Sequence, residues 1–391
     1  SVARLVEQNL KNALAVFSGT GGSLNWMLHF PYISAHLGIR ITPTYLARLS
    51  KKTPLILEID PARDKSFFTL AQETAEGMVS GIDTIMRIFF ERGLISDAPT
   101  VDGRWSERIR KARPANDHII HATPLNKRGG IIELRGNFCQ SSVLKRAGMR
   151  ADYDKKIYIA IYYQGESSAQ QELFHGTKVL KRLRRAVTKA ELLSLLKWNG
   201  HSPKRAGQGR GLDLPSWAKL GKGEIFERMV KEKTLRLMVI VAGEGPRASG
   251  MPEMYYPSEY LNRDPILRHI CALLTDGRYS GATYGPCIGH AYPEAMEGGG
   301  IAGIVTGDWI YIDFEKGQID LLDKARSLRA GKPTPLKPEA ILRRPVIKGR
   351  MAWMRRRQRE LPPSIRGLLD NLSPTTEGCA PAGMEYKTTL R

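Results

Sequence analysis

The chain has 391 residues, of which 42% are hydrophobic and 25% are charged. This balance excludes an intrinsically disordered or fibrous protein, and the length allows two or three domains with cores of their own. The formal net charge of +21 is compatible with nucleic acid, an anionic membrane surface or an acidic small molecule as a partner.

The sequence also suggests where the protein works. It contains no apolar run long enough to span a bilayer, and its first twenty residues lack the pattern of a signal peptide. We therefore expect a soluble protein of the cytoplasm or an organelle matrix that does not enter a membrane. The four cysteines, Cys139, Cys271, Cys287 and Cys379, are far apart and form no CxxC pair, which argues against a zinc ribbon and against a disulfide framework.

The chain begins with a predicted helix over residues 5–16, where apolar residues recur at helical spacing until the glycines of 19–22 end it. Ser23 and Asn25 follow, and a second apolar helical pattern starts at Trp26. A helix that begins there would offer free backbone N–H groups to an anion. The alternative is an ordinary turn between two helices.

Further elements are predicted before and after a change of domain. Residues 53–59 (TPLILEI) are typical of a strand, and residues 70–90 of an amphipathic helix. The polar, basic residues 106–113 are typical of a linker, so we expect the first domain to end near residue 113. In the remainder, 114–391, residues 129–137 predict a strand followed by a loop, and 156–163 (KIYIAIYY) predict a core strand.

A basic insertion is expected over residues 177–233. Within 178–233 there are fifteen Lys and Arg but five Asp and Glu. Thr188 and Glu191 have the spacing of a capping box and predict a short helix with a leucine face. The glycine-rich residues 200–211 are typical of a mobile loop. The insertion could hold RNA, another partner or a lid, but our default hypothesis is a solvated surface insertion.

Residues 239–314 combine short apolar runs with glycine-rich loops. The runs at 235–242 and 270–275 predict buried strands, and 309–314 with 318–321 predict a hairpin. Several short strands joined by glycine turns indicate a barrel-like β-domain. The loops that follow the two buried strands carry residues able to do chemistry, namely Glu244, Glu253, Asp276, Arg278, Ser280, Thr283, His290 and Glu294.

Four sequence pieces follow one another in this stretch: GMPEM at 250–254, LTDGRYSG at 274–281, IGH at 288–290 and PEA at 293–295. In this order they resemble the C-terminal signature of the dihydroxy-acid dehydratase and 6-phosphogluconate dehydratase family. The resemblance implies an α/β (α+β) protein. In it, residues 1–113 would be the end of an α/β domain and residues 114–391 a β-barrel-like swivelling domain.

The resemblance also implies an activity, the removal of water from a 2,3-dihydroxy acid or a sugar acid to give a 2-keto acid. The family uses a serine base, an iron-sulfur cluster and Mg²⁺. Ser280 is the matching serine, and Glu253 matches a magnesium ligand. Taken alone, Ser280 is typical of a serine in a glycine turn and Glu253 of a surface glutamate, and these alternatives stay open.

Three more residues are expected to contact substrate. Residues 21–29 resemble the family's Gly-Gly-Ser-Thr-Asn pattern, in which Ser23 and Asn25 match while Leu24 replaces the threonine. Thr283, three residues after Ser280, is the third expected contact. The partner would then be a small anionic hydroxy acid, and the resemblance further implies a homodimer when complete.

Other parts of the family's chemistry are expected elsewhere. In the family, the cluster cysteines, two magnesium-binding acids and a modified lysine lie in motifs upstream of the position of Ser1, and none of the four cysteines matches a cluster position. We therefore expect activity to need an upstream half.

The alternative is a catalytically inactive fragment or a binding module whose basic insertion engages RNA or another acidic partner. We favour the enzyme and expect no nucleic acid, because the insertion has few aromatic residues to stack on bases, chiefly Trp198, Trp217 and Phe226.

Overall fold

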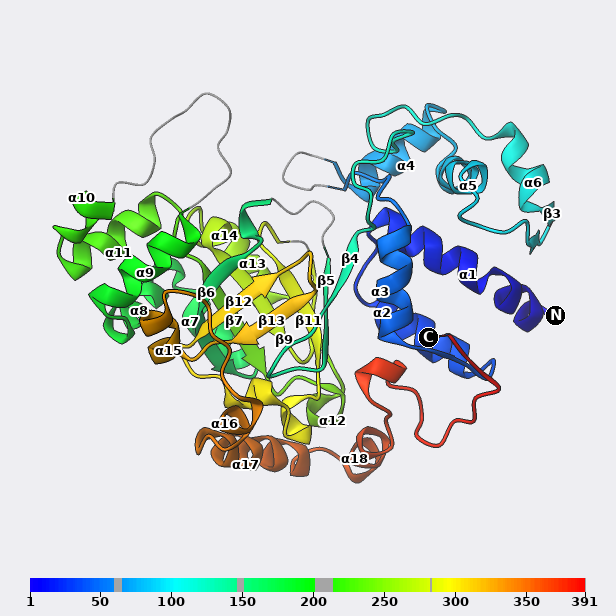
Figure 1. Ribbon diagram of the computed structural model, residues 1–391. Helices are drawn as coiled ribbons and strands as arrows, with labels where there is room; N and C mark the ends of the chain where they lie inside the picture. Colours follow the sequence, from blue (N-terminus) through cyan, green and yellow to red (C-terminus); the bar gives the residue numbers. More distant parts are fainter. Residues whose placement is uncertain (60–64, 146–150, 201–213, 282, 391) are drawn as a thin grey trace. The chain divides into compact units, whose positions relative to one another are not determined.

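The computed structural model describes residues 1–59, 65–145, 151–200, 214–281 and 283–390. Contacts divide the chain into two compact units, each described here by itself (Figure 1). The first comprises residues 1–133, 144–148 and 373–391, and the second comprises 134–143 and 149–372. The division therefore differs from a single boundary at residue 113, because residues 114–133 and the last residues of the chain belong to the first unit.

The helices of the first unit follow the predicted stop signals only in part. Helix α1 (Val2–Thr20) ends at Gly21, whose φ of 59° is the left-handed cap that glycine adopts at low cost. The single helix expected over 70–90 is wrong, since the chain turns at Gly77 and Gly81, both with positive φ, between α4 and α5. The helices are α2 (Trp26–Ala35), α3 (Pro43–Lys52), α4 (Phe67–Ala75), α5 (Ile82–Glu91) and α6 (Trp105–Arg108).

Strands are few among the described residues of the first unit. The strand expected over 53–59 is wrong: Leu55 and Leu57 are buried, but each makes only an isolated bridge, to Asn126 and Ile120. Strand β1 (Ile39–Ile41) pairs in parallel with β14 (Thr388–Leu390), so the end of the chain completes this unit. A short antiparallel ribbon is formed by β2 (Pro99–Thr100) and β3 (Gly103–Arg104).

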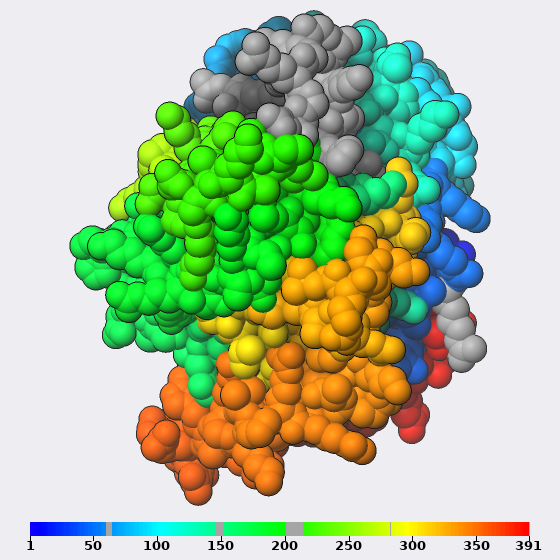
Figure 2. All heavy atoms as spheres, turned by 60° about the vertical axis from the view of Figure 1, so that its left-hand side comes forward, coloured from blue at the N-terminus to red at the C-terminus, as the bar shows by residue number. Residues whose placement is uncertain are grey.

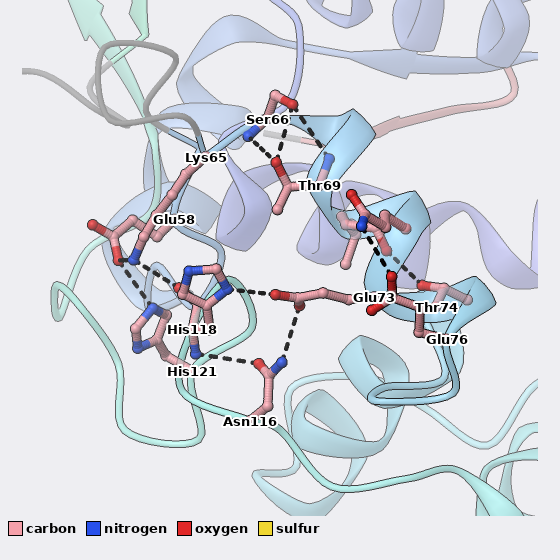
Figure 3. A network of polar contacts seen from close by, with 12 residues as sticks. Glu58, Lys65, Ser66, Thr69, Glu73, Thr74, Glu76, Asn116, His118 and His121 are labelled. Atoms are coloured by element: carbon pink, nitrogen blue, oxygen red, sulfur yellow. Dashed lines mark hydrogen bonds and ion pairs between the residues drawn. The ribbon is translucent and has the colours of Figure 1, made fainter.

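A network of acids and histidines holds together distant segments of the first unit (Figure 3). Glu73, on α4, is buried and bonds to Nδ1 of His118. Nearby, Oε2 of Glu58 accepts from Nζ of Lys65 at 2.7 Å and lies 3.1 Å from Nε2 of His121. The bond of Glu73 links α4 to the segment 116–121, and the bonds of Glu58 link residue 58 to Lys65 and to the same segment. No local sequence pattern predicts these links.

One mixed sheet organises the second unit. Its order is β13-β12-β6-β7-β9-β11-β5-β4, and β5 and β4 are where the chain crosses between units. Strands β6, β7, β9 and β11 are parallel neighbours, while β12 is antiparallel to both β6 and β13. The strands are β4 (Ile131–Leu134), β5 (Ser141–Lys145), β6 (Lys156–Gln164), β7 (Leu237–Ala242), β9 (Cys271–Thr275), β11 (Cys287–Tyr292), β12 (Trp309–Asp313) and β13 (Gln318–Leu321).

The sheet is nearly closed on itself. Arg135, directly after β4, forms a parallel bridge with Gln318 at the start of β13. Both faces of β6 and β7 are buried, which explains their near-continuous apolar sequences. The predicted α/β class with a barrel-like sheet is confirmed, as are the core strand at 156–163 and the hairpin at 309–321.

The helices of the second unit surround this sheet (Figure 1). They are α7 (Glu166–Leu173), α8 (Val179–Ala186), α9 (Lys189–Asn199), α10 (Leu214–Ala218), α11 (Lys222–Lys231), α12 (Pro246–Ser249), α13 (Tyr256–Arg263), α14 (Leu267–Ile270), α15 (Lys324–Ala330), α16 (Pro338–Leu342), α17 (Val346–Arg359) and α18 (Pro363–Asp370). Within the part of the chain described, no helix combines the length and apolar character needed to cross a membrane.

The basic insertion is part of the core, so the default hypothesis of a solvated surface insertion is wrong for its helices. The capping box predicted at Thr188 is present and opens α9. Leu192, Leu196 and Ile225 are completely buried in the same cluster as strands β6 and β7. Figure 2 shows the green residues of this segment gathered in one continuous part of the surface. The predicted mobile loop falls almost wholly on residues 201–213, which lie outside the described residues.

This packing predicts a large cost for truncating the insertion's apolar face. Leu196→Ala should lower the free energy of unfolding by about 2–5 kcal/mol, because a buried leucine is lost and a cavity remains. Lys197→Ala, an exposed neighbour on α9, is the matched control. Urea unfolding of both variants measures the difference, and a loss below about 1 kcal/mol in Leu196→Ala would contradict a shared core.

Candidate functional site

The two loops singled out by the sequence are joined by backbone pairing. After β7, helix α12 starts at Gly245 and Pro246 and ends at Gly250, whose φ is 74°. The chain then forms β8 (Glu253–Met254), which pairs in parallel with β10 (Arg278–Tyr279). Glu253 lies opposite Arg278 in this register, so residues 25 positions apart in sequence become neighbours.

Ser280 extends this ribbon. Its backbone N–H donates to the carbonyl of Met254 at 2.7 Å. Side chains two residues apart in a strand share a face, so Ser280 continues the face that carries Arg278 and Glu253. Glu253 is exposed and Ser280 half-buried, and both can therefore be reached from solvent. The ribbon thus brings the backbones of Glu253, Arg278 and Ser280 next to one another.

Two neighbours of Ser280 have local bonds of their own. Arg278 donates from Nε to the carbonyl of Met251 at 2.9 Å, which fixes the guanidinium against the loop before β8. The hydroxyl of Thr283 donates to the carbonyl of Gly285 at 2.8 Å. Arg278 is therefore held in place by a backbone carbonyl, while the role of Thr283 as a substrate contact stays a prediction.

Ser23 and Asn25 lie in the first unit, where they form the turn before α2. The N–H of Asn25 donates to Oγ of Ser23 at 3.3 Å, and the N–H of Trp26 donates to the carbonyl of Ser23 at 3.1 Å. The turn itself therefore occupies N–H groups at the start of α2, as expected for the alternative of an ordinary interhelical turn. Substrate contact by Ser23 and Asn25 stays a prediction.

A completely buried carboxylate stands behind the ribbon. Asp276, at the end of β9, accepts the backbone N–H of Gly243 at 3.0 Å and of Glu244 at 3.1 Å on Oδ1. Its Oδ2 accepts the N–H of Ala295 at 2.9 Å. These three donors lie in the loops that follow β7 and β11. Asp276 consequently ties together the loops at the carboxyl ends of three parallel strands.

Glu244 and Glu294 extend this cluster of buried acids. Oε1 of Glu244 accepts the N–H of Glu166 at 2.9 Å and pairs with Nη1 of Arg357 at 3.0 Å. Glu294 accepts the N–H groups of Arg247 at 2.8 Å and of Ala248 at 3.2 Å, at the start of α12. All three acids belong to the loops that the sequence predicts to be functional, but no spacing rule connects them to these partners.

Burial governs the protonation of these acids. It raises the pKa of Asp276 to about 6, although the three backbone donors favour the charged form. Burial, followed by the nearby charge of Asp276, raises the pKa of Glu294 to about 8. The charges that face the pair are those of Glu244 and Glu297. Near neutral pH, Asp276 is therefore mainly ionised and Glu294 mainly protonated.

A complete metal site is not formed by the described residues. Within the ranges given above, no three His, Cys, Asp or Glu side chains group so that they could hold a metal ion. A single carboxylate such as Glu253 supplies one oxygen donor, whereas Mg²⁺ needs an octahedral set of oxygens. The residues in hand thus do not fit an iron-sulfur cluster or a closed magnesium site, and no reaction step is derived through either group.

Comparisons with known proteins agree with the sequence pieces at this site. The model described as dihydroxy-acid/6-phosphogluconate dehydratase N-terminal matches residues 3–108, and the corresponding C-terminal model matches 219–360. Together they cover more than half of the chain. Ser23 and Asn25 fall in the first match, and Glu253, Ser280 and Thr283 in the second. Residues 109–218 lie outside both.

Curated relatives carry the corresponding name. The chain is 28% identical over 340 residues to a dihydroxy-acid dehydratase of Archaeoglobus fulgidus, covering 85% of this chain and 50% of the relative. A dihydroxy-acid dehydratase of Caldicellulosiruptor bescii is 28% identical over 338 residues, with coverage of 82% and 50%. One of Saccharolobus solfataricus is 28% identical over 329 residues, with coverage of 81% and 47%. The chain spans about half the length of the curated relatives it matches.

The buried acids predict an unusual dependence of stability on pH. Folding raises both pKa values above those of the unfolded chain, which lie near 4. The stability that these two groups contribute is therefore fully present below about pH 4. It is lost as the pH rises through about 6 for Asp276 and about 8 for Glu294. Between pH 5 and 9 the loss should be on the order of a few kcal/mol. Urea unfolding across this range measures it.

Replacing the acids should flatten that dependence. Asp276→Asn and Glu294→Gln cannot ionise, so the difference in unfolding free energy between each variant and the wild type should change with pH. Glu339→Gln, at an exposed glutamate on α16, is the control and should track the wild type. If the unfolding free energy of the wild type and of all three variants changed with pH in the same way, the pKa values of Asp276 and Glu294 would not be raised by folding.

Proposed function

Because the chain belongs to the dihydroxy-acid/6-phosphogluconate dehydratase family, we propose that it is a hydro-lyase that removes water from a 2,3-dihydroxy acid or a sugar acid to give a 2-keto acid. The observation that supports this proposal best is the pairing of β8 with β10, which sets Glu253 opposite Arg278 and is extended by the backbone N–H of Ser280. The substrate would be a small anion, which suits a ribbon that includes a guanidinium.

Ser280 is the proposed base. Its alkoxide oxygen would take the proton from C2, the electrons of the C2–H bond would form the C2=C3 double bond of the enol, and the C3–O bond would break. The departing hydroxide would take the proton back from Ser280 and leave as water, which regenerates the alkoxide. The enol then becomes the 2-keto acid, so the products are the keto acid and one water. A serine hydroxyl is a weak base near neutral pH, so nearby positive charge must stabilise its alkoxide. Among the described residues Arg278 supplies such a charge two positions away.

Glu253 is the proposed contributor to metal binding. The family implies Mg²⁺ and an iron-sulfur cluster, and carboxylate oxygen is a suitable donor for the hard magnesium ion. Its exposed position on the same face as Ser280 agrees with such a role. We propose it as one ligand only. A homodimer and a location in the cytoplasm or an organelle matrix stay predictions.

The alternative of an RNA-binding module has no specific observation in its favour. Trp217 and Phe226, two of the aromatic residues that could stack on bases, are buried in the core. Trp198 packs edge-on against Trp309, with ring centroids 5.5 Å apart. The described aromatic residues of the insertion thus hold the fold together, and base stacking would have to displace them.

The proposed function predicts that removing one oxygen abolishes most activity. Ser280→Ala should lower kcat roughly 10²–10⁴-fold, the usual contribution of a positioned base, with little change in folding. The measurement is formation of 2-keto acid from a branched 2,3-dihydroxy acid and from an aldonate. Ser364→Ala, an exposed serine on α18, is the control and should leave the rate unchanged.

Two results would count against the proposal. A rate in Ser280→Ala equal to that of the wild type would remove Ser280 as the base while leaving the reaction intact. Absence of keto acid from both substrates with a wild-type protein that includes the expected upstream half and is supplied with Mg²⁺ and the iron-sulfur cluster would contradict the dehydratase itself. The relative rates on the two substrates would also distinguish a branched-chain acid from a sugar acid, since each gives a different keto acid.

A further inference from the structure

The loop that carries Ser280 starts from a completely buried acid. Asp276 precedes Ser280 by four residues, and its two carboxylate oxygens accept three backbone N–H groups from the loops after β7 and β11. One of those loops, beginning at Gly243, continues through α12 to Glu253. A single side chain therefore connects the backbones that lead to both Ser280 and Glu253.

The backbone directly after Asp276 is closely packed and hydrogen-bonded at Gly277. A Cβ placed on Gly277 would lie 2.6 Å from the carbonyl oxygen of Glu244, so only glycine fits against that loop. The carbonyl of Gly277 accepts the N–H of His290 at 3.0 Å, and its N–H donates to Oγ1 of Thr275 at 2.9 Å. The backbone on the C-terminal side of Asp276 is thus held from both neighbouring loops.

Two other buried acids, Glu244 and Glu294, hold the same loops. Glu294 accepts two N–H groups at the start of α12, and Glu244 joins α7 and α17 through Glu166 and Arg357. Among the described residues, Arg357 is the one cation that forms an ion pair with any of the three acids. Loop positions here depend mainly on carboxylates that accept backbone N–H groups.

Burying ionised groups is costly, and a cluster that served stability alone would contain neutral partners. An asparagine at position 276 would keep one acceptor oxygen, but its NH₂ group would face a backbone N–H. The charged acid therefore satisfies all three donors at an expense in stability, as the raised pKa of Asp276 indicates. Such a cost is typical of sites where the position of a reacting group matters.

We propose that Asp276 is a positioning residue for the dehydration, whose carboxylate fixes the loops after β7, β9 and β11 so that Ser280 stays in register with Glu253. This inference rests on the proposed function, because the position of Ser280 matters only if Ser280 reacts. Asp276 is buried behind the ribbon and does not touch substrate. It acts through the four residues that separate it from Ser280.

The first test measures how easily the loops open. Amide hydrogen exchange of the purified full-length protein is measured in the wild type and in Asp276→Asn. Peptides covering 277–281 and 290–297 should exchange at least about 10-fold faster in the variant, because local opening becomes easier when the acceptor is lost. Peptides from the hairpin 309–321 should not change. This measurement needs no activity, so it stands apart from the dehydratase assay.

The second test reads the consequence for the reaction. Asp276→Asn should lower kcat on the order of 10²-fold while KM changes less than about 3-fold, since a displacement of about 1 Å at a reacting group has that effect. Asp313→Asn is the matched control, because Asp313 is also a buried acid that accepts a backbone N–H, from Lys316. It lies at the end of β12, which runs antiparallel to β6, and should leave kcat unchanged.

A further variant covers the case in which Asp276→Asn does not fold. Asp276→Glu keeps the charge and both acceptors, but its extra methylene must displace Gly277 because the site is completely buried. It should fold and lose roughly 10-fold in kcat, with faster exchange at 277–281. A folded Asp276→Asn or Asp276→Glu with wild-type kcat, or with unchanged exchange at 277–281, would overturn the inference. A wild type that stays inactive when the expected upstream half, Mg²⁺ and the iron-sulfur cluster are all present would instead overturn the proposed function.

Discussion

The carboxylate of Asp276 accepts hydrogen bonds from three backbone N–H groups and so connects the loops that follow strands β7, β9 and β11. Parallel strands end at the same edge of a sheet, and the loops that follow them would be free to separate if nothing joined them. Here one buried acid joins three such loops. Strands β8 and β10 lie in two of these loops, so the backbones that carry Glu253 and Ser280 both lead back to donors or neighbours of one buried acid.

The sheet explains why these loops meet at all. Strands β6, β7, β9 and β11 lie side by side in parallel, although 72 residues of helical insertion and linker separate β6 from β7 in sequence. Its helices fill the core with Leu192, Leu196 and Ile225 before the chain enters β7, between β6 and β9. The Lys and Arg side chains that are described in this segment are exposed or half-buried, while its leucines pack against the sheet. A segment that looks in sequence like an addition is therefore part of what supports the site.

Positive charges lie mainly on exposed helices, whereas several acids are buried behind the candidate site. The net charge of +21 comes largely from helices such as α8 and α17, where some cations pair with acids, as in Arg184 with Glu227. The interior behind the candidate site has the opposite character, with Glu244, Asp276 and Glu294 all buried. Exposed cations thus lie on the surface helices, while buried acids hold the loops inside the second unit.

Local patterns were enough to predict much of the fold. Apolar runs predicted β6, β7 and β9, glycines predicted the end of α1, and the spacing of Thr188 and Glu191 predicted the start of α9. The pieces GMPEM and LTDGRYSG singled out the two loops that pair through β8 and β10. These signals are readable because helix, strand and turn preferences act between residues a few positions apart.

Other features were decided by the tertiary structure alone. Residues 53–59 have a strand-like sequence, yet their partners at Ile120 and Asn126 pair with them only at single bridges. Asp276 is 33 residues from Gly243, and Arg357 is 113 from Glu244. Which acid accepts which N–H follows from the order of strands in the sheet and from exclusion of water around them. Those are properties of the assembled chain, since the energy of a buried carboxylate depends on neighbours that only folding brings within reach.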